Sequence, residues 1–183
     1  MHIKRSELIL NPDGSIYHLN LLPEHLAPTV ITVGDPNRVQ SVANYFDVVE
    51  FTTQKREFHT QTGIYKGKRI TVISTGIGTD NIDIVLNELD ALVNIDLKKR
   101  AIKPVFTPLN IVRIGTSGSI QKNIPINSFL ISEYAVGFDS LLHFYDSENI
   151  QYLKISEAIK QHTNWFHRKS DPYVVKCSDQ LLN

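Results

Sequence analysis

The sequence predicts an α/β protein in which strands alternate with helices. Apolar runs at Thr29–Val33 and at residues 110–114 are typical of buried strands. Each run leads into a glycine-containing loop, and the first is followed by apolar residues at helical spacing. Ligands of open α/β sheets collect beyond the carboxyl ends of the strands, so these loops are where we expect a site.

Length and composition favour one globular domain without nucleic-acid or membrane partners. The chain has 183 residues, and its 19 Lys and Arg balance 19 Asp and Glu, which argues against a nucleic-acid binder. Cys177 is the only cysteine, which excludes an internal disulfide and a cysteine-rich metal site. Without a signal peptide or a run of eighteen apolar residues, we expect a cytoplasmic protein.

The first strand–helix connection has the features of an anion site. The run Thr29–Val33 stops at Gly34, and apolar residues at 39, 42, 43 and 46 predict a helix that Pro36 helps to begin. The helix N–H groups and the positive end of the helix dipole would point the same way. Gly34 would allow close approach, and Arg38 could fold back onto the same anion. An ordinary strand–helix connection is the alternative.

Three more strands and a second helix are expected before residue 96. The strands are predicted at residues 48–53, 57–65 and 69–75, with a tight turn at 66–68. Thr79 or Asp80 is expected to cap the helix that follows. The apolar residues of this helix share one face: Ile82, Val85, Leu89 and Leu92.

Gly76 and Gly78 also match the start of a dinucleotide-binding motif, because they lie between a strand and a helix. Asn81 takes the place of the third glycine, and Asp96 lies about twenty residues further on, at the spacing of a ribose-binding acid. An oxidoreductase is therefore one alternative, and it rests on this glycine pair.

The later part of the chain is expected to hold one helix and two strands. Residues 96–107 are interpreted as a basic, solvated connector, and residues 140–150 as irregular. Strands are predicted at 128–135 and 173–177, with a turn at 137–139. The predicted helix at 155–166 would place Ile155, Ile159 and Phe166 inside.

The loop after residues 110–114 concentrates ligand-type side chains. Arg113 offers a planar fork of donors suited to an oxyanion, and Thr116, Ser117 and Ser119 add hydroxyls. If parallel strands bring this loop beside Gly34, then Arg38 and Arg113 together can hold a phosphate dianion. A plain turn with Arg113 in solvent is the alternative.

Several other site classes lack their motifs. The chain has no Gly-x-x-x-x-Gly-Lys-Ser/Thr loop, and residues 115–118 fall one residue short of the Gly-x-Ser-x-Gly elbow. His162 and His167 are spaced wrongly for two zinc ligands on one helix face. No close carboxylate pair suggests ordinary glycosidase chemistry.

Four ordered motifs resemble those of the nucleoside phosphorylase family, most closely its bacterial uridine phosphorylase branch. They are residues 33–39 (VGDPNRV), 56–58 (REF), 74–78 (STGIG) and 113–121 (RIGTSGSIQ), and the resemblance begins at about Tyr17. It implies a three-layer phosphorylase/hydrolase-like α/β fold with a twisted mixed sheet, as one domain over residues 1–183 that is incomplete at its C-terminus.

The resemblance also implies a phosphate site. Arg38 and Arg113 would be the catalytic arginines, and both would bind phosphate together with Gly34 and Thr116. Arg56 would reach the phosphate of a neighbouring subunit.

Nucleoside and cation positions follow from the same resemblance. His18 would approach the ribose 5′-hydroxyl across a dimer contact, and Thr116, Ser117 and Gly118 would border the ribose and base. A further set matches positions that hold a monovalent cation such as K⁺ between subunits, although its last member stands where a small hydroxyl residue is expected: Glu57, Ile77 and Asn81.

The implied activity is phosphorolysis of a nucleoside, with uridine as the first candidate, to free base and ribose 1-phosphate. Inorganic phosphate is the co-substrate, no organic cofactor is needed, and the assembly would be a homo-oligomer built from dimers, such as a hexamer. The alternatives are a purine nucleoside phosphorylase, a hydrolytic nucleosidase, and a truncated domain that binds phosphate or assembles without catalysing. Retention of both Arg38 and Arg113 argues against the nucleosidase.

Two departures from the family pattern shape the expectations. The segment at residues 96–108 is longer than expected and would alter a surface or oligomer contact. The chain also ends before the family's later motifs, which supply the base-recognition loop and the glutamates for the ribose hydroxyls. From these 183 residues alone we therefore expect weak or absent turnover, and an exposed sheet edge or poor solubility.

Overall fold

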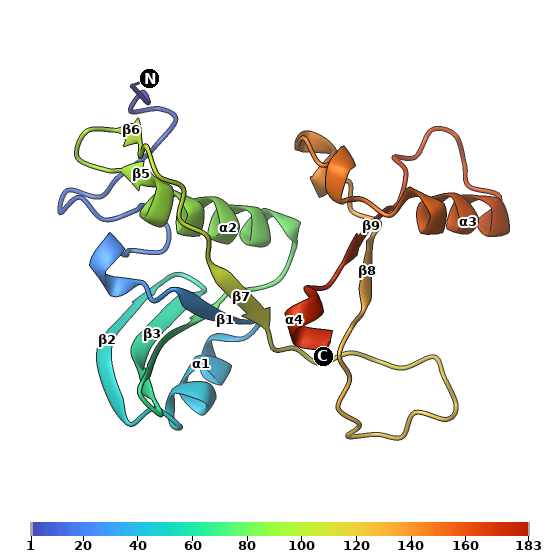
Figure 1. The fold of residues 1–183 in the computed structure, drawn as a ribbon, viewed down its shortest axis with the longest axis horizontal. Helices are drawn as coiled ribbons and strands as arrows, with labels where there is room; N and C mark the ends of the chain where they lie inside the picture. The colour runs from blue at the N-terminus through green and yellow to red at the C-terminus, as the bar shows by residue number, and fades with distance from the viewer. Residues whose placement is uncertain (1, 183) are drawn as a thin grey trace. The chain divides into compact units, whose positions relative to one another are not determined.

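The computed structural model describes residues 2–182, which form two compact units that meet in sequence between Ser117 and Gly118 (Figure 1). Met1 and Asn183, and with them the predicted chain end, lie outside the described residues. The α/β class is confirmed. A single domain over residues 1–183 stays a prediction, and each unit is described by itself.

The first unit is built on a mixed five-stranded sheet in the order β2-β3-β4-β1-β7. Strand β1 pairs in parallel with β4 on one side and with β7 on the other, whereas β2, β3 and β4 form an antiparallel meander. The strands are β1 (Thr29–Val33), β2 (Val48–Lys55), β3 (Phe58–Tyr65), β4 (Lys68–Ser74) and β7 (Asn110–Arg113). The three early strand predictions and the turn at residues 66–68 are confirmed.

Alternating side chains give the sheet two apolar faces, each covered by one helix (Figure 1). Val30 and Ile73 face a cluster that contains Leu89 of α2 (Thr79–Asn94). Val33 and Val72 point the other way, against α1 (Pro36–Ala43). The predicted three-layer arrangement of helix, mixed sheet and helix is thus confirmed.

Helix α1 starts as its sequence suggests, with Pro36 as its first residue. The Asp35 side chain caps it by accepting the Asn37 N–H at 2.8 Å. The helix ends at Ala43, and Phe46 still packs against the same apolar cluster from just beyond that end.

The predicted cap of α2 is wrong. Neither Thr79 nor Asp80 caps this helix, because it already begins at Thr79 and the N-cap position falls on Gly78. Gly78 has a φ of 103°, a conformation that favours glycine over every other residue.

The basic connector is also more ordered than predicted. Strands β5 (Ile95–Asp96) and β6 (Ala101–Ile102) pair as a short antiparallel hairpin. Lys98 and Lys99 are exposed, as expected, but Arg100 is not simply solvated. Its guanidinium donates to the backbone carbonyls of Ile3, Lys4 and Leu8, and so holds the N-terminal segment against the hairpin.

The second unit contains a two-stranded antiparallel sheet of β8 (Tyr134–Gly137) and β9 (Tyr173–Lys176). Helix α3 (Leu153–Thr163) lies between these strands in the sequence, and α4 (Asp179–Leu182) follows β9. The later strand and the helix are confirmed in kind. The strand predicted at 128–135 is wrong before Tyr134, and Gly137 belongs to the strand, where it pairs with Tyr173.

Two further expectations for this unit need correction. Phe166 lies beyond the end of α3 and is 52% exposed, so it is not an interior residue. Residues 140–150 contain two 3-10 turns, Leu141–Phe144 and Glu148–Ile150. No helix within residues 2–182 has the length and apolar character needed to cross a membrane.

Helix α2 offers a matched pair of leucines for testing the core. Leu89 is 1% exposed and faces the sheet, whereas Leu86 is 44% exposed on the same helix. Leu89→Ala should lower the free energy of unfolding by about 2–5 kcal/mol, because it leaves a cavity in the core. Leu86→Ala should change it by less than about 1 kcal/mol. Urea denaturation measures both, and equal losses would contradict the described face of α2.

Candidate functional site

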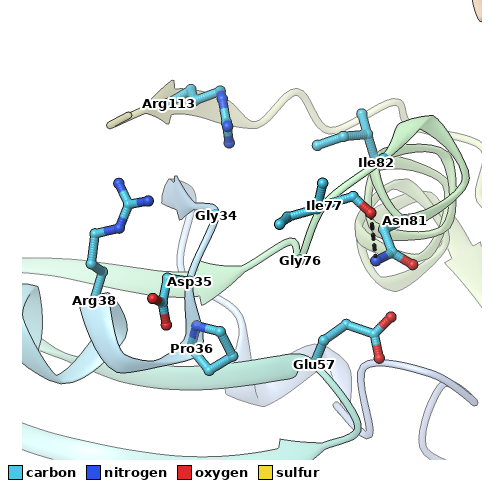
Figure 2. Close-up of a pocket in the computed structure, with 11 residues that line it drawn as sticks. Gly34, Asp35, Pro36, Arg38, Glu57, Gly76, Ile77, Asn81, Ile82 and Arg113 are labelled. Carbon is cyan, nitrogen blue, oxygen red and sulfur yellow. Dashed lines mark hydrogen bonds between the residues drawn. The ribbon is translucent and has the colours of Figure 1, made fainter. Parts of the chain in front are cut away.

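The carboxyl ends of three strands meet at one edge of the first unit. Because β1 runs parallel to both β4 and β7, their ends lie side by side. A cavity of about 570 Å³ opens there (Figure 2). Most of its lining residues come from the ends of these strands, from the loops after them and from the first turns of α1 and α2, whereas Glu57 comes from the turn between β2 and β3. The lining residues are Gly34, Asp35, Pro36, Arg38, Glu57, Gly76, Ile77, Gly78, Asn81, Ile82 and Arg113.

Arg38 and Arg113 converge at Gly34. A Cβ placed on Gly34 would lie 3.6 Å from Arg38 Nη2 and 3.9 Å from Arg113 Nη2. Figure 2 shows both guanidiniums directed toward the space beside Gly34. Arg38 comes from α1 and Arg113 from the end of β7, so the fold brings together two of the arginines that the sequence singled out.

Two arginines and two carboxylates, Asp35 and Glu57, line this cavity, so an anion site depends on where the guanidiniums are placed and not on the net charge. Within residues 2–182, neither guanidinium takes part in a salt bridge. The nearby Asp35 carboxylate already accepts the Asn37 N–H as the cap of α1. Two unpaired guanidinium groups over a glycine backbone match the planar, multi-donor binding that phosphate oxygens require.

The other side of the cavity is formed by Glu57, Ile77 and Asn81 around Gly76 (Figure 2). Gly76 has a φ of 67°, and a Cβ there would lie 2.6 Å from Asn81 Nδ2 and 2.9 Å from Glu57 Cγ. Only glycine therefore fits at this position.

The three residues of the predicted cation site are thus gathered in one place. Carboxylate and carbonyl oxygens suit a hard cation. Asn81 Nδ2 donates to the Ile77 carbonyl at 3.2 Å, so the amide nitrogen occupies one lone pair of an oxygen that a cation would use. The Ile77 carbonyl keeps a second lone pair, and the K⁺ site stays a prediction.

Arg56 precedes the cavity-lining Glu57 in the turn between β2 and β3. It is exposed at the tip of the β2–β3 hairpin, and its φ of 56° lies in the left-handed region that non-glycine residues rarely adopt. Arg56 does not belong to the residues that line the cavity. Its predicted role toward a neighbouring subunit stays a prediction.

His18 is held by a residue that the sequence did not reveal. His18 Nδ1 lies 2.7 Å from Glu88 Oε1 on α2, and the backbone N–H groups of His18 and Leu19 donate to the same carboxylate. This carboxylate fixes the ring, and the predicted ribose contact stays a prediction. Glu88 is separated from His18 by 70 residues, so only the fold could identify the pair.

The hydroxyl-bearing loop after β7 does not line the cavity. Thr116 and Ser117 are exposed and irregular, and Gly118 opens the second unit. Their predicted contacts with phosphate, ribose and base stay predictions. Sequence reasoning in turn passed over Asp35, Gly76 and Gly78 as lining residues, although the two glycines had been noticed as a pair.

The position of Asp96 excludes it as the ribose-binding acid of a dinucleotide site. Asp96 lies just beyond the C-terminal end of α2, whereas the cavity lies at the N-terminal end. The 16 residues of this helix separate the two ends by roughly 24 Å. Its carboxylate accepts the Lys99 N–H at 2.9 Å, which holds the pKa of Asp96 below its usual value. Asp96 cannot reach a ligand beside Gly76 and Gly78.

The chain belongs to the Phosphorylase superfamily, whose family model matches residues 28–183. It is 34% identical over 124 residues to a uridine phosphorylase of Thermococcus kodakarensis, covering 68% of this chain and 40% of that protein. A Haemophilus influenzae uridine phosphorylase is 35% identical over 134 residues, with 72% and 48% covered. A DeoD-type purine nucleoside phosphorylase of Clostridium novyi is 33% identical over 116 residues, with 63% and 44% covered.

A solved structure supports the same assignment. A Trypanosoma brucei nucleoside phosphorylase, described as showing uridine phosphorylase activity, superposes with a TM-score of 0.84 at 32% identity. The superposition covers 95% of this chain and 59% of that one. The predicted family is confirmed, and the chain spans less than half the length of the three curated relatives named above.

Replacement of Gly34 and of Gly76 by alanine should have different effects on the melting temperature. At Gly34 an added Cβ meets its neighbours only at ordinary contact distances, so Gly34→Ala should melt within a few degrees of the parent protein. At Gly76 the positive φ and the close Asn81 and Glu57 atoms should make Gly76→Ala destabilising by about 1 kcal/mol or more. Thermal denaturation compares the two variants, and an unchanged melting temperature for Gly76→Ala would contradict the described loop.

Proposed function

We propose that this chain supplies the phosphate site of a nucleoside phosphorylase that cleaves uridine to uracil and ribose 1-phosphate. The observation that carries the proposal is the convergence of two unpaired guanidiniums, from Arg38 and Arg113, at Gly34. Membership of the Phosphorylase superfamily and the uridine phosphorylases among its relatives support it.

The proposed reaction is an attack of a phosphate oxygen on C1′ of the nucleoside. The new C1′–O bond forms as the bond from C1′ to the base nitrogen breaks, and the bonding electrons leave with the base. Positive charge develops on the sugar and negative charge on the base. A phosphate dianion held by Arg38 and Arg113 is then both the nucleophile and the group that stabilises the cationic sugar.

The other proposed contacts depend on assembly. Arg56 and His18 would each act on the site of a neighbouring subunit in a homo-oligomer, and Thr116, Ser117 and Gly118 would border the nucleoside. These roles rest on the family resemblance, and no step of the reaction depends on the predicted cation. With one cysteine in the chain, the cytoplasm is the proposed location.

A purine nucleoside is the second candidate substrate. The DeoD-type purine nucleoside phosphorylase of Clostridium novyi matches at 33% identity, close to the value for the uridine phosphorylases. The phosphate chemistry would be the same, because the phosphate attacks C1′ of the sugar in either substrate. Parallel assays with uridine and inosine distinguish the two substrates.

Arg38→Ala and Arg113→Ala should each weaken phosphate use by about 10- to 100-fold, because each removes charge-assisted hydrogen bonds worth about 1.5–3 kcal/mol. The loss should appear in the KM for phosphate when base release from uridine is followed by chromatography. Arg5→Ala is the matched control, since Arg5 is exposed and does not line the cavity.

Each failed outcome has a distinct meaning. Base release that is equally fast without phosphate would identify a hydrolase and contradict the proposal. Phosphate binding without base release from either nucleoside would favour the non-catalytic phosphate-binding domain. An unchanged KM for phosphate in both arginine variants would remove the assignment of this cavity.

A further inference from the structure

Helix α1 is tied to strand β3 by two polar contacts. His59 Nδ1 lies 3.2 Å from the Pro36 carbonyl oxygen, and Gln61 Nε2 donates to Gln40 Oε1 at 3.0 Å. His59 and Gln61 are two residues apart on β3, so both face α1, whereas Phe58 packs on the opposite face. We call these four residues, His59, Gln61, Pro36 and Gln40, the β3–α1 brace.

Chemistry fixes the direction of the His59 contact. A backbone carbonyl only accepts hydrogen bonds, so Nδ1 must carry the hydrogen that His59 donates to Pro36. In the neutral ring Nε2 is then an acceptor, and it faces Gln61 Nε2 at 3.5 Å. Gln61 Oε1 is buried without a hydrogen-bond partner among the described residues. Gln61 therefore takes part in the brace through its amide nitrogen.

The brace acts on the segment that carries Arg38. Helix α1 has only eight residues, and it is held to the sheet otherwise by apolar packing of Val39 and Ala43. Pro36 and the Asp35 cap fix where the helix begins, and because apolar packing is non-directional, the polar contacts from β3 add to the control of its rotation on the sheet. Pro36 and Gln40 lie one turn apart, and Arg38 lies between them. The directional bond from His59 to Pro36 thus acts on the turn from which Arg38 extends.

We propose that His59 is a positioning residue for phosphate, which acts through Pro36 to hold Arg38 opposite Arg113 at Gly34. The inference rests on the proposed function, because it takes phosphate to be the anion in the cavity. His59 does not line the cavity and needs no contact with the ligand. Its contribution is the geometry in which both guanidiniums reach one anion, since charge-assisted bonds weaken when donors are displaced.

The test is calorimetric titration of the purified protein with inorganic phosphate. His59→Ala should weaken phosphate binding by about five- to tenfold, the effect of one hydrogen bond. His59→Asn should restore binding to near the parent value, because its side-chain N–H can take the place of Nδ1–H. His59→Gln extends its N–H toward the position of Nε2 instead, so it should bind as weakly as His59→Ala.

The Asn and Gln variants separate positioning from general loss of stability. Both keep a polar side chain in the same place and differ in where the N–H lies, so loss of the imidazole ring or of polarity would affect them alike, whereas loss of the bond to Pro36 affects only the Gln variant. His25→Ala is the matched control, because His25 is also half-buried in this unit but stacks on Phe51 away from the cavity. It should leave phosphate affinity unchanged.

Several results would overturn the inference. Equal phosphate affinity in the parent, His59→Ala and His59→Gln proteins would remove the positioning role while leaving the proposed phosphate site intact. Equal affinity in the Asn and Gln variants would do the same, even if His59→Ala failed to fold. If the parent protein bound no phosphate, the proposed function itself would fail, and the role of His59 would fall with it.

Discussion

The register of β1 between its two parallel neighbours determines where the chemistry of the first unit lies. Thr32 pairs with Ile73 of β4 and with Arg113 of β7, so the loops after all three strands begin at the same level. A slip of one residue in β7 would turn the Arg113 side chain to the opposite face of the sheet and separate it from Arg38. Apolar side chains on both faces specify the register of β1 and β4, whereas β7 is held at the same level by its ladder with β1.

A local charge arrangement lets an electrically neutral chain offer an anion site. The 19 basic and 19 acidic residues give no general field that would attract an anion, so attraction must come from the few groups at the cavity. Asp35 is engaged as a helix cap, and Glu57 lies on the side of the cavity beside Asn81 (Figure 2). The guanidiniums of Arg38 and Arg113 face the remaining space without a carboxylate partner among residues 2–182. A brace on α1 would matter most in such a site, where two donors must share one ligand.

Sequence reasoning predicted what local patterns encode and missed what the fold brings together. Strand runs, helical periods and the glycine–arginine pairs gave most elements of the first unit, together with the gathering of Arg38 and Arg113. The cap at Gly78 was missed because Thr79 and Asp80 are ordinarily better caps, and only the backbone conformation shows that glycine is needed. Arg100 and His59 escaped notice because their partners are distant in sequence, and a lone charged or titratable side chain carries no periodic signal.

The measurement that tests this account most directly is a crystal structure of the protein grown in the presence of inorganic phosphate. The account predicts one phosphate beside Gly34, within hydrogen-bond distance of the guanidiniums of both Arg38 and Arg113. Phosphate bound by only one of these arginines, or bound elsewhere while the cavity holds water, would contradict the claim that the two arginines form a single phosphate site.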